Sequence, residues 1–377
     1  MPLFSIKQSY LGIDIGGSAI KLVELKSVNN RPTLVTYGFA EKRSDLLKNS
    51  VSEEMRAIVE ALKQVTKAAR VSSRLAVTAL PSFTVFSSII SLPQMSKKEL
   101  MSAVKWEAKK FVPMPVEEMI LDWEVLKEDS LAAKVSGINA QGQVNHKEAN
   151  MPSPETAGKT SAKDLKVLLT AAPKNLVQKY MEIFKAADLQ LVALETEAFS
   201  VERSLIGHDK APIMIVDIGA IATDIVVFSE GIPMLTRSID VGGDTITKTI
   251  ASTLRVNPER AEQFKRDFFI STQTASQSNI PKAIEFVVNS ITNEIRYVLN
   301  LYQNQNTGRN IEKIVLAGGS AFLTNLPEYF TKLFNIRTYI GDPWGRVAYP
   351  VELKPVWNEI GPRFAVAVGL ALRQLGS

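Results

Sequence analysis

The chain has 377 residues, of which 45% are hydrophobic and 22% charged, and its formal net charge is +5. This length and composition are typical of a two-lobed or two-domain globular protein with a sizeable core. Lysine and arginine are spread along the chain, so no nucleic-acid-binding stripe is expected. The absence of cysteine excludes disulfides and thiolate chemistry, and with only two histidines neither a His-ligated metal nor a Ser/His/Asp triad is expected.

The termini give no sign of export or membrane insertion. The N-terminal stretch MPLFSIKQSY lacks the apolar centre of a secretory signal, and no stretch approaches about 18 uninterrupted apolar residues. The C-terminal AVAVGLALRQLGS is predicted to be a short helix packed in the core. We therefore expect a soluble, cytoplasmic protein.

The first quarter of the chain alternates between strand and helix patterns. Residues 10–16 and 20–26 flank Gly-Gly-Ser and predict a β-hairpin. Apolar positions at helical spacing predict a helix over 51–70. Two strands are expected at 74–81 and 83–93.

A lysine-rich helix follows. Ser96 and Glu99 form a capping-box pattern at its start, and the helix should stop before Pro113. Trp106 and Phe111 are expected in the core or at a subdomain interface, with a peptide-docking surface as the alternative. The other face carries Lys97, Lys98, Lys105, Lys109 and Lys110; we expect it to be solvated, with contact to an anionic bilayer as the alternative.

Residues 129–163 are rich in small and polar residues and contain no aromatic residue. Such a segment cannot bury enough apolar surface to offset the entropy of ordering it, so a disordered insertion within a domain is predicted. A strand at 165–173, a helix at 175–188 and a strand at 189–195 are expected to form a β-α-β unit. The boundary between the two halves is placed near 207–212.

The second half begins as the first does, with a predicted hairpin of two apolar strands. Its remaining elements are a third strand, several helices and one more strand. In chain order the expected ranges are 213–219, 223–229, 234–241, 244–254, 258–267, 281–304, 313–320, 322–334 and 362–375.

One phrase occurs in both halves, as LGIDIGGSAIKLVEL at 11–25 and IVDIGAIATDIVVF at 215–228. Small residues at a hairpin turn leave backbone N–H groups open to phosphate oxygens. The first turn offers Gly16, Gly17 and Ser18 with the charge of Lys21, and the second offers Gly219, Ala220 and the hydroxyl of Thr223. We therefore expect two hairpins to grip a polyphosphate from opposite sides.

A carboxylate stands at the strand end of each turn. Asp14 and Asp217 would repel a phosphate unless a cation lay between them. Mg²⁺ takes one or two carboxylates and keeps several waters. Both residues are predicted to hold Mg²⁺ through water.

Three further patterns could seat a sugar and a base. A glycine-rich turn, Gly242, Gly243 and Asp244, opens a helix. Glu262 and Lys265 share a helix face, where the carboxylate could accept the ribose hydroxyls. A strand-to-helix turn with Gly318, Gly319 and Ser320 lets the backbone approach a flat base.

The order of these motifs resembles the actin-like ATPase superfamily, with phosphate motifs at 14–21 and 217–224 and an adenosine motif at 317–320. Two stretches, AVKWEAKKFVPMPVEEMILDW (103–123) and IGPRFAVAVG (360–369) with its following LALR, resemble the PilM family of type IV pilus assembly proteins. That family is itself similar to FtsA. The resemblance covers nearly the whole chain apart from the insertion.

The resemblance implies an α/β, actin-like (ribonuclease H-like) two-lobed ATPase fold with an FtsA-type inserted small subdomain. It implies a first lobe of 1–92 plus 191–210, a small subdomain of 93–190 and a second lobe of 211–377. It also implies ATP or ADP with Mg²⁺ in the central cleft. Glu195 and Glu197 are the candidates for orienting an attacking water, and weak or no ATPase activity is expected.

The implied partner is the cytoplasmic N-terminal tail of a PilN-type bitopic membrane protein, seated in a groove beside the small subdomain. Contact with the pilus motor components is a further expectation. The protein would then lie at the inner face of the cytoplasmic membrane, held there through its partner.

Two alternatives remain from the sequence. A sugar-type kinase of the same superfamily would need a catalytic Asp between the lobes, and the linking segment lacks one. An FtsA-like filament protein would need an amphipathic C-terminal helix with a basic face, which the sequence ending at Gly376 and Ser377 does not show.

Overall fold

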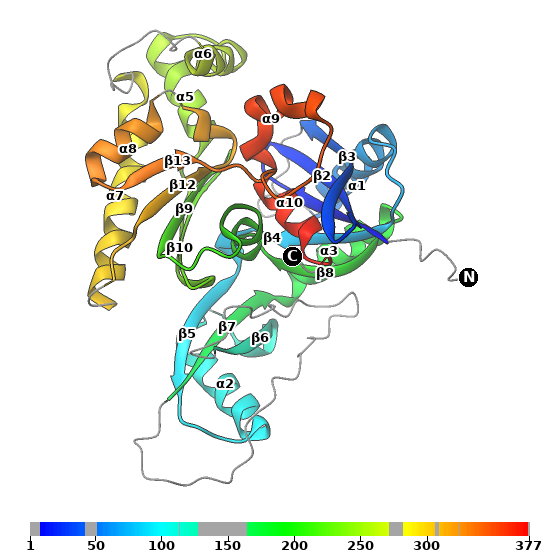
Figure 1. The fold of residues 1–377 in the computed structure, drawn as a ribbon, viewed down its shortest axis with the longest axis vertical. Helices are drawn as coiled ribbons and strands as arrows, with labels where there is room; N and C mark the ends of the chain where they lie inside the picture. Colours follow the sequence, from blue (N-terminus) through cyan, green and yellow to red (C-terminus); the bar gives the residue numbers. More distant parts are fainter. Residues whose placement is uncertain are drawn as a thin grey trace.

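The computed structural model describes residues 8–41, 51–112, 114–126, 164–270, 282–305, 309–323 and 325–375. Two lobes, each built on a five-stranded sheet, lie side by side, and a small subdomain extends from them (Figure 1). The predicted insertion, 129–163, lies outside the described residues.

The first lobe is built on a sheet of order β3-β2-β1-β4-β8. Strand β1 is antiparallel to β2 and parallel to β4. Two helices, α1 (Val51–Ala68) and α3 (Lys174–Ala186), bury their apolar faces against the sheet. The strands are β1 (Ser9–Ile15), β2 (Ala19–Val28), β3 (Arg31–Glu41), β4 (Leu75–Leu80) and β8 (Gln190–Thr196).

The second lobe repeats this topology, with the sheet order β11-β10-β9-β12-β13. Its strands are β9 (Ile213–Ile218), β10 (Thr223–Ser229), β11 (Ile232–Ile239), β12 (Lys313–Ala317) and β13 (Arg337–Ile340). Its helices are α5 (Gly243–Leu254), α6 (Pro258–Ile270), α7 (Lys282–Gln305) and α8 (Leu326–Phe334). The repeated phrase of the sequence therefore marks the same hairpin in two equivalent sheets.

The small subdomain is a three-stranded antiparallel sheet of order β5-β7-β6, covered by α2 (Lys97–Phe111). Its strands are β5 (Phe86–Leu92), β6 (Met119–Leu126) and β7 (Leu165–Pro173). The predicted capping box at the start of α2 is present, with Ser96 and Glu99 bonded to each other. The predicted burial of Trp106 is wrong, because its side chain is 68% exposed; Phe111 is also exposed.

The β-α-β unit expected over 165–195 does not form. Strand β7 pairs in the small sheet, whereas β8 pairs with β4 in the first lobe, and α3 packs on the first lobe. The proposed domain limits stay a prediction. By strand pairing, β5 belongs with the small sheet, and by the packing of its side chains, α3 belongs with the first lobe.

Two helices lie between the large sheets, α4 (Glu197–Val201), which continues as a π-helical turn, Glu202–Ile206, and α10 (Ala365–Leu372). Their side chains share one core with β4 and β8 of the first lobe and β9, β10 and β12 of the second. Helix α10 also packs on β1 and β2, where a Cβ at Gly12 would overlap the carbonyl oxygen of Ala367. Helix α9 (Lys354–Ile360) carries Trp357, which stacks on Trp344 with ring centroids 3.8 Å apart.

Within the described part of the chain, no helix is long and apolar enough to cross a membrane.

Candidate functional site

A cleft of about 1250 Å³ opens between the two lobes. Its walls come from the turns of both repeated hairpins, the start of α5, one face of α6, the turn after β12 and the segment before α10. The cleft thus gathers most of the residues that the sequence patterns singled out.

The two hairpin turns have the same backbone geometry. The Gly16 amide donates to the Ala19 carbonyl at 3.0 Å, and the Gly219 amide donates to the Ala222 carbonyl at 2.9 Å. The turns also meet, because the space that a Cβ at Gly17 would need is filled by the side chain of Ile221. Glycine at 17 therefore allows the two turns to close on each other at the base of the cleft.

In the first turn, Asp14 and Lys21 face each other across the hairpin. They are register partners on β1 and β2, and Lys21 Nζ donates to Asp14 Oδ2 at 2.5 Å. Gly16, Gly17 and Ser18 line the cleft beside this pair. All five predicted residues of the first turn therefore lie at the cleft wall.

In the second turn, the register partner of Asp217 is Asp224, which takes the place that Lys21 has in the first turn. Desolvation, with the neighbouring charge of Asp224, raises the pKa of Asp217 to about 7. Desolvation also raises the pKa of Asp224 to about 6. Asp224 was not among the predicted site residues, although it ends the 217–224 motif. The available signal was that Asp217 and Asp224 face each other when the two strands of the predicted hairpin are paired.

The two glutamates predicted near the lobe junction have different surroundings. Glu197 lines the cleft and accepts from the Ser82 amide at 2.9 Å. Burial raises the pKa of Glu197 well above its usual range, and the charges of Asp224 and Asp14 raise it further. Glu195 does not line the cleft.

Glu195 instead forms a buried ion cluster. Its side chain is 1% exposed, and it pairs with Arg203 and, at 2.9 Å, with Arg373. Arg203 in turn donates to the Gly369 carbonyl of α10 at 2.9 Å. This arrangement gives Glu195 a structural position, joining β8 to the two central helices.

Tyr180 of α3 was missed by the sequence patterns. It lines the cleft and is fully buried, and its hydroxyl has no hydrogen-bond partner among the residues that the structure describes. Burial raises the pKa of Tyr180, with the charges of Glu197 and Asp14 acting in the same direction. Buried hydroxyls are nearly always hydrogen-bonded, so this oxygen fits a water or ligand atom in the cleft.

The predicted turn at Gly242, Gly243 and Asp244 holds the second hairpin in place. The amides of Gly243 and Asp244 donate to the Gly219 and Ala220 carbonyls at 2.9 and 2.8 Å. Gly243 and Asp244 line the cleft. Their amides already donate to these carbonyls, so the amides are not available to bind an anion.

Thr223 and Gly242 stand behind the cleft wall. Neither lines the cleft. Thr223 is fully buried, and its hydroxyl donates to the Val241 carbonyl at 2.6 Å, which ties β10 to the start of α5. A Cβ at Gly242 would overlap the Ala220 carbonyl, so glycine permits this close approach.

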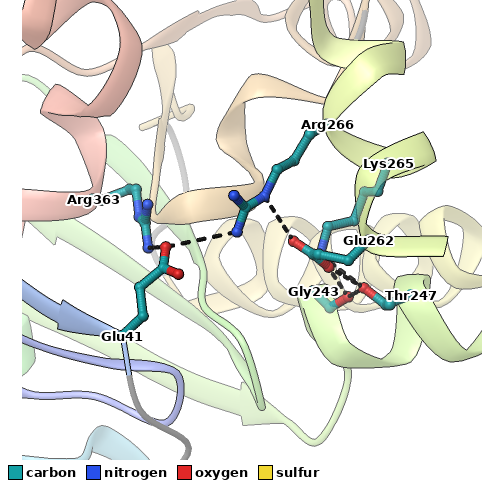
Figure 2. A network of polar contacts seen from close by, with 7 residues as sticks. All are labelled: Glu41, Gly243, Thr247, Glu262, Lys265, Arg266 and Arg363. Atoms are coloured by element: carbon teal, nitrogen blue, oxygen red, sulfur yellow. Dashed lines mark hydrogen bonds and ion pairs between the residues drawn. The ribbon is translucent and has the colours of Figure 1, made fainter. Parts of the chain in front are cut away.

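Glu262 and Lys265 meet Thr247 at one wall of the cleft. Figure 2 shows Glu262 between Lys265 and Arg266; its Oε2 accepts from Lys265 Nζ and the Thr247 hydroxyl, both at 2.6 Å. Lys265 Nζ also donates to the Gly243 carbonyl at 3.2 Å. These bonds lower the pKa of Glu262 against the opposing effect of desolvation. The predicted pair lies on α6, is joined to α5 through Thr247, and presents an ionised carboxylate.

The turn after β12 lies against the second hairpin. Gly318 has φ +84°, and a Cβ there would overlap Asp217 and the Ile218 carbonyl. Its amide donates to the Pro362 carbonyl at 3.2 Å. Gly318, Gly319 and Ser320 all line the cleft. Glycine is needed at 318 because an L side chain would meet both strain and overlap.

Charged side chains from both lobes cross the mouth of the cleft. Glu41, at the end of β3, lies 3.6 Å from Arg266 of α6 and 3.9 Å from Arg363 (Figure 2). Arg363 also lies over the ring of Phe39, with the guanidinium carbon 5.7 Å from the ring centroid. Arg266 follows Lys265 directly, but nothing in the sequence around Glu41 indicates this contact.

Within the described residues, no cluster of three or more His, Cys, Asp or Glu is placed to bind a metal ion by protein ligands alone. The carboxylates of Asp14, Asp217 and Asp224 still line the cleft together. Such a donor set fits a cation such as Mg²⁺, which uses one or two carboxylates and completes its shell with water and ligand oxygens.

Comparison with known proteins identifies the family. The family described as "Type IV pilus assembly protein PilM" matches residues 12–137 and 155–375. A chain of the solved "PilM-PilN type IV pilus biogenesis complex" is 28% identical, with a TM-score of 0.78, over 97% of this chain and 98% of that chain.

More distant similarities support the fold. Cell division protein FtsA of Neisseria meningitidis is 21% identical over 398 residues, 97% of this chain and 90% of the relative. FtsA of Borreliella burgdorferi matches over 42% of each chain at 26% identity. The ethanolamine utilization protein EutJ from Carboxydothermus hydrogenoformans superposes with a TM-score of 0.53 at 16% identity, over 99% of this chain and 92% of that chain.

The predicted actin-like, two-lobed fold of the FtsA-like branch is therefore confirmed. The sugar-kinase and filament alternatives are not favoured by these matches. By its sequence match over both lobes and by its structure, the chain belongs to the type IV pilus assembly protein PilM family.

Proposed function

We propose that this chain is a nucleotide-binding adaptor of type IV pilus assembly that carries the cytoplasmic tail of a PilN-type membrane protein. The observation that supports this most is its similarity, over 97% of its length, to a chain of a PilM-PilN complex. The protein would then work at the inner face of the cytoplasmic membrane without spanning it.

The ligand that fits the cleft is ATP or ADP. Gly16 and Gly219 form equivalent turns at its base, and the amides of Gly17 and Ser18 make no main-chain hydrogen bond within the described residues. Free amides at a glycine turn are donors for phosphate oxygens, and Lys21 adds a positive charge beside them.

The acidic base of the cleft supports Mg²⁺ as the companion of the nucleotide. Desolvation raises the pKa of both Asp217 and Asp224, and the charge of Asp224 raises the pKa of Asp217 further, so a cation bound beside these carboxylates would be stabilised by them. Asp14 and Asp217, with Asp224, would hold Mg²⁺ directly or through water. The ion would neutralise phosphate charge next to these carboxylates.

The second lobe offers seats for ribose and base. Glu262 presents a carboxylate held by Thr247 and Lys265, which can accept ribose hydroxyls. The Gly318–Gly319 turn allows the backbone to approach a base, and Arg363 lies beside Gly319. A planar guanidinium in this position can stack on the base.

Glu197 is the group best placed to act on a water beside the phosphates. It lines the cleft and its pKa is raised, and the Tyr180 hydroxyl, which has no hydrogen-bond partner in the described part of the chain, belongs to a residue that also lines the cleft. A carboxylate with a raised pKa can accept a proton at neutral pH more readily than an ordinary one. Slow ATP hydrolysis is therefore the activity to look for, and nucleotide binding does not depend on it.

The test uses the full chain and its Asp217→Asn variant in calorimetric titrations with Mg-ATP and Mg-ADP. A second titration uses a synthetic peptide of the cytoplasmic tail of a PilN-type protein from the same organism. We expect the variant to lose nucleotide affinity and to keep its circular dichroism spectrum. Unchanged nucleotide affinity would refute the phosphate site, and absence of peptide binding in either nucleotide state would refute the adaptor role.

A further inference from the structure

The outward face of α2 exposes large apolar side chains that a folded monomer does not need on its surface. Trp106 is 68% exposed and Met101 is 47% exposed. Phe111 and, just past the helix, Met114 are exposed as well. Exposed aromatic and methionine side chains gathered on one element indicate a contact surface.

Lysines separate these apolar side chains. Lys98, Lys105 and Lys109 recur at intervals of seven and four residues, so they form one stripe along the helix, with Met101 on one side and Trp106 on the other. All three are exposed. We call Lys98, Met101, Lys105, Trp106 and Lys109 the outer face of α2.

The positive charge of the outer face is largely unbalanced. Within the described residues, no ion pair joins Lys98 or Lys105 to a carboxylate, and Lys109 makes only a loose contact of 3.9 Å with Glu117. The two acidic residues of the helix are already engaged: Glu99 in the capping box and Glu107 with Lys110 at 2.8 Å. The face is therefore complementary to a negatively charged surface.

The fold of α2 does not depend on this face. Leu100, Val104 and Ala108, on another side of the helix, pack against the small sheet, and the capping box fixes the start of the helix. Figure 1 shows α2 at the end of the small subdomain that points away from both large lobes. Among the described residues, the outer face is thus exposed and lies away from the cleft between the lobes.

We propose that the outer face of α2 binds an anionic membrane surface. Lysine is depleted at protein–protein interfaces, where burying its strongly hydrated ammonium group is costly, whereas lysines around an exposed tryptophan suit the headgroup layer of a bilayer. The lysine ammonium groups meet lipid phosphates while the Trp106 indole lies among the headgroups. Because the apolar side of α2 is occupied by the protein core, the helix adsorbs on the surface and does not insert.

The expected strength follows from the number of lysines. A lysine close to an anionic leaflet contributes about a fivefold increase in affinity, so three together contribute roughly a hundredfold. Such binding weakens as salt is raised, because the attraction acts within a Debye length of the surface.

The experiment is a co-sedimentation of the full chain with vesicles of phosphatidylcholine alone or mixed with phosphatidylglycerol, at low and high salt. The test variant is Lys98→Gln with Lys105→Gln and Lys109→Gln. The matched control neutralises three exposed basic residues of α1, with Arg56→Gln, Lys63→Gln and Lys67→Gln. Tryptophan emission is recorded for the wild type and for Trp106→Phe, and nucleotide binding of each variant verifies folding.

We expect salt-sensitive binding to the anionic vesicles only, lost in the α2 variant and retained in the α1 control. A blue shift of the emission should accompany binding and be absent from Trp106→Phe. Equal binding to neutral vesicles, or equal loss in both triple variants, would overturn the proposal. Retention on immobilised polyglutamate without binding to anionic vesicles would also overturn it, and would assign the face to an acidic protein.

Discussion

Glu41 of β3 and Arg266 of α6 lie 3.6 Å apart across the mouth of the cleft, so an ion pair joins the first lobe to the second. Arg363 approaches the same carboxylate at 3.9 Å. Both members of the pair are more than half exposed. The contact therefore joins the two lobes at the cleft without being part of either core.

Replacing Glu41 by Gln should speed nucleotide release without unfolding the protein. Exposed ion pairs contribute about 0 to 1 kcal/mol, so the dissociation rate of a fluorescent nucleotide should rise by at most about fivefold. Stopped-flow fluorescence measures it. Glu230→Gln, which removes an exposed pair with Arg309 far from the cleft, is the control and should leave the rate unchanged. An equal rate in both variants would show that the contact does not restrain the mouth.

We expect Glu195 to contribute to the stability of the fold and Glu197 to contribute to ATP hydrolysis. Glu195→Gln should cost about 3 to 5 kcal/mol of unfolding free energy, because Arg203 and Arg373 lose a buried partner. Glu197→Gln should leave stability and nucleotide binding nearly intact and reduce any ATP hydrolysis by about a hundredfold or more. Chemical denaturation and single-turnover hydrolysis measure the two effects. Hydrolysis at the wild-type rate in Glu197→Gln would remove its catalytic role.

Asp14 and Lys21 should behave as a coupled pair. Both are nearly buried, with side chains 6% and 15% exposed, so Lys21→Met alone should destabilise the protein by about 3 kcal/mol. Adding Asp14→Asn should restore part of that loss, since the uncompensated carboxylate is then removed. A double-mutant cycle by urea denaturation gives the coupling. Additive effects would mean that the 2.5 Å contact contributes no net stability.

The stability of the nucleotide-free protein should fall as pH rises toward neutrality. The pKa of Asp217 is raised to about 7 from an ordinary 3.8, so the folded state binds this proton more tightly than the unfolded state does. The resulting stabilisation is complete below about pH 4 and is lost as the pH rises through 7. Asp217→Asn should flatten the profile by about 4 kcal/mol between these limits, since each pKa unit corresponds to about 1.4 kcal/mol.

Added Mg²⁺ should reduce this loss of stability with rising pH, because the ion stabilises the ionised carboxylates. The control is Asp209→Asn; the pKa of Asp209 is lowered by its hydrogen bond to Lys313, so this variant should lose stability at neutral pH instead. Thermal unfolding at a series of pH values distinguishes the two. A profile for Asp217→Asn that parallels the wild type would contradict the expected role of this carboxyl.

The hairpins, the capped helix and the order of the cleft motifs could be predicted because each rests on local patterns. The turns at Gly16 and Gly219 are set by residues within a few positions of each other. Strands β3, β6 and β13 were not predicted. The burial pattern of each strand is irregular or half-buried, so its own sequence lacks a clear strand signal. Each strand forms because it pairs with a neighbouring strand of its sheet.

Contacts between distant segments were beyond the reach of the sequence. A threonine at a glycine turn looks like a phosphate donor, but the hydroxyl of Thr223 is taken by the Val241 carbonyl. The sequence did not show which of Glu195 and Glu197 faces the cleft. The end of β8 at Thr196 decides this, because it leaves Glu195 in the core and Glu197 at the cleft. Trp106 was expected to be buried because large aromatic residues usually are.

The repeated architecture suggests a protein made of two independent halves, yet α10 prevents that division. Val368 and Leu372 pack with β2 of the first lobe, whereas Val366 and Leu370 pack with β9 and β10 of the second. A fragment ending near Gly207 would lack α10, which belongs to the core of the first lobe. The apolar face of the sheet that α10 covers would then be exposed. Neither half should therefore be obtainable as a stable separate fragment, and co-expressed halves should recover the fold only by reassembling around α10.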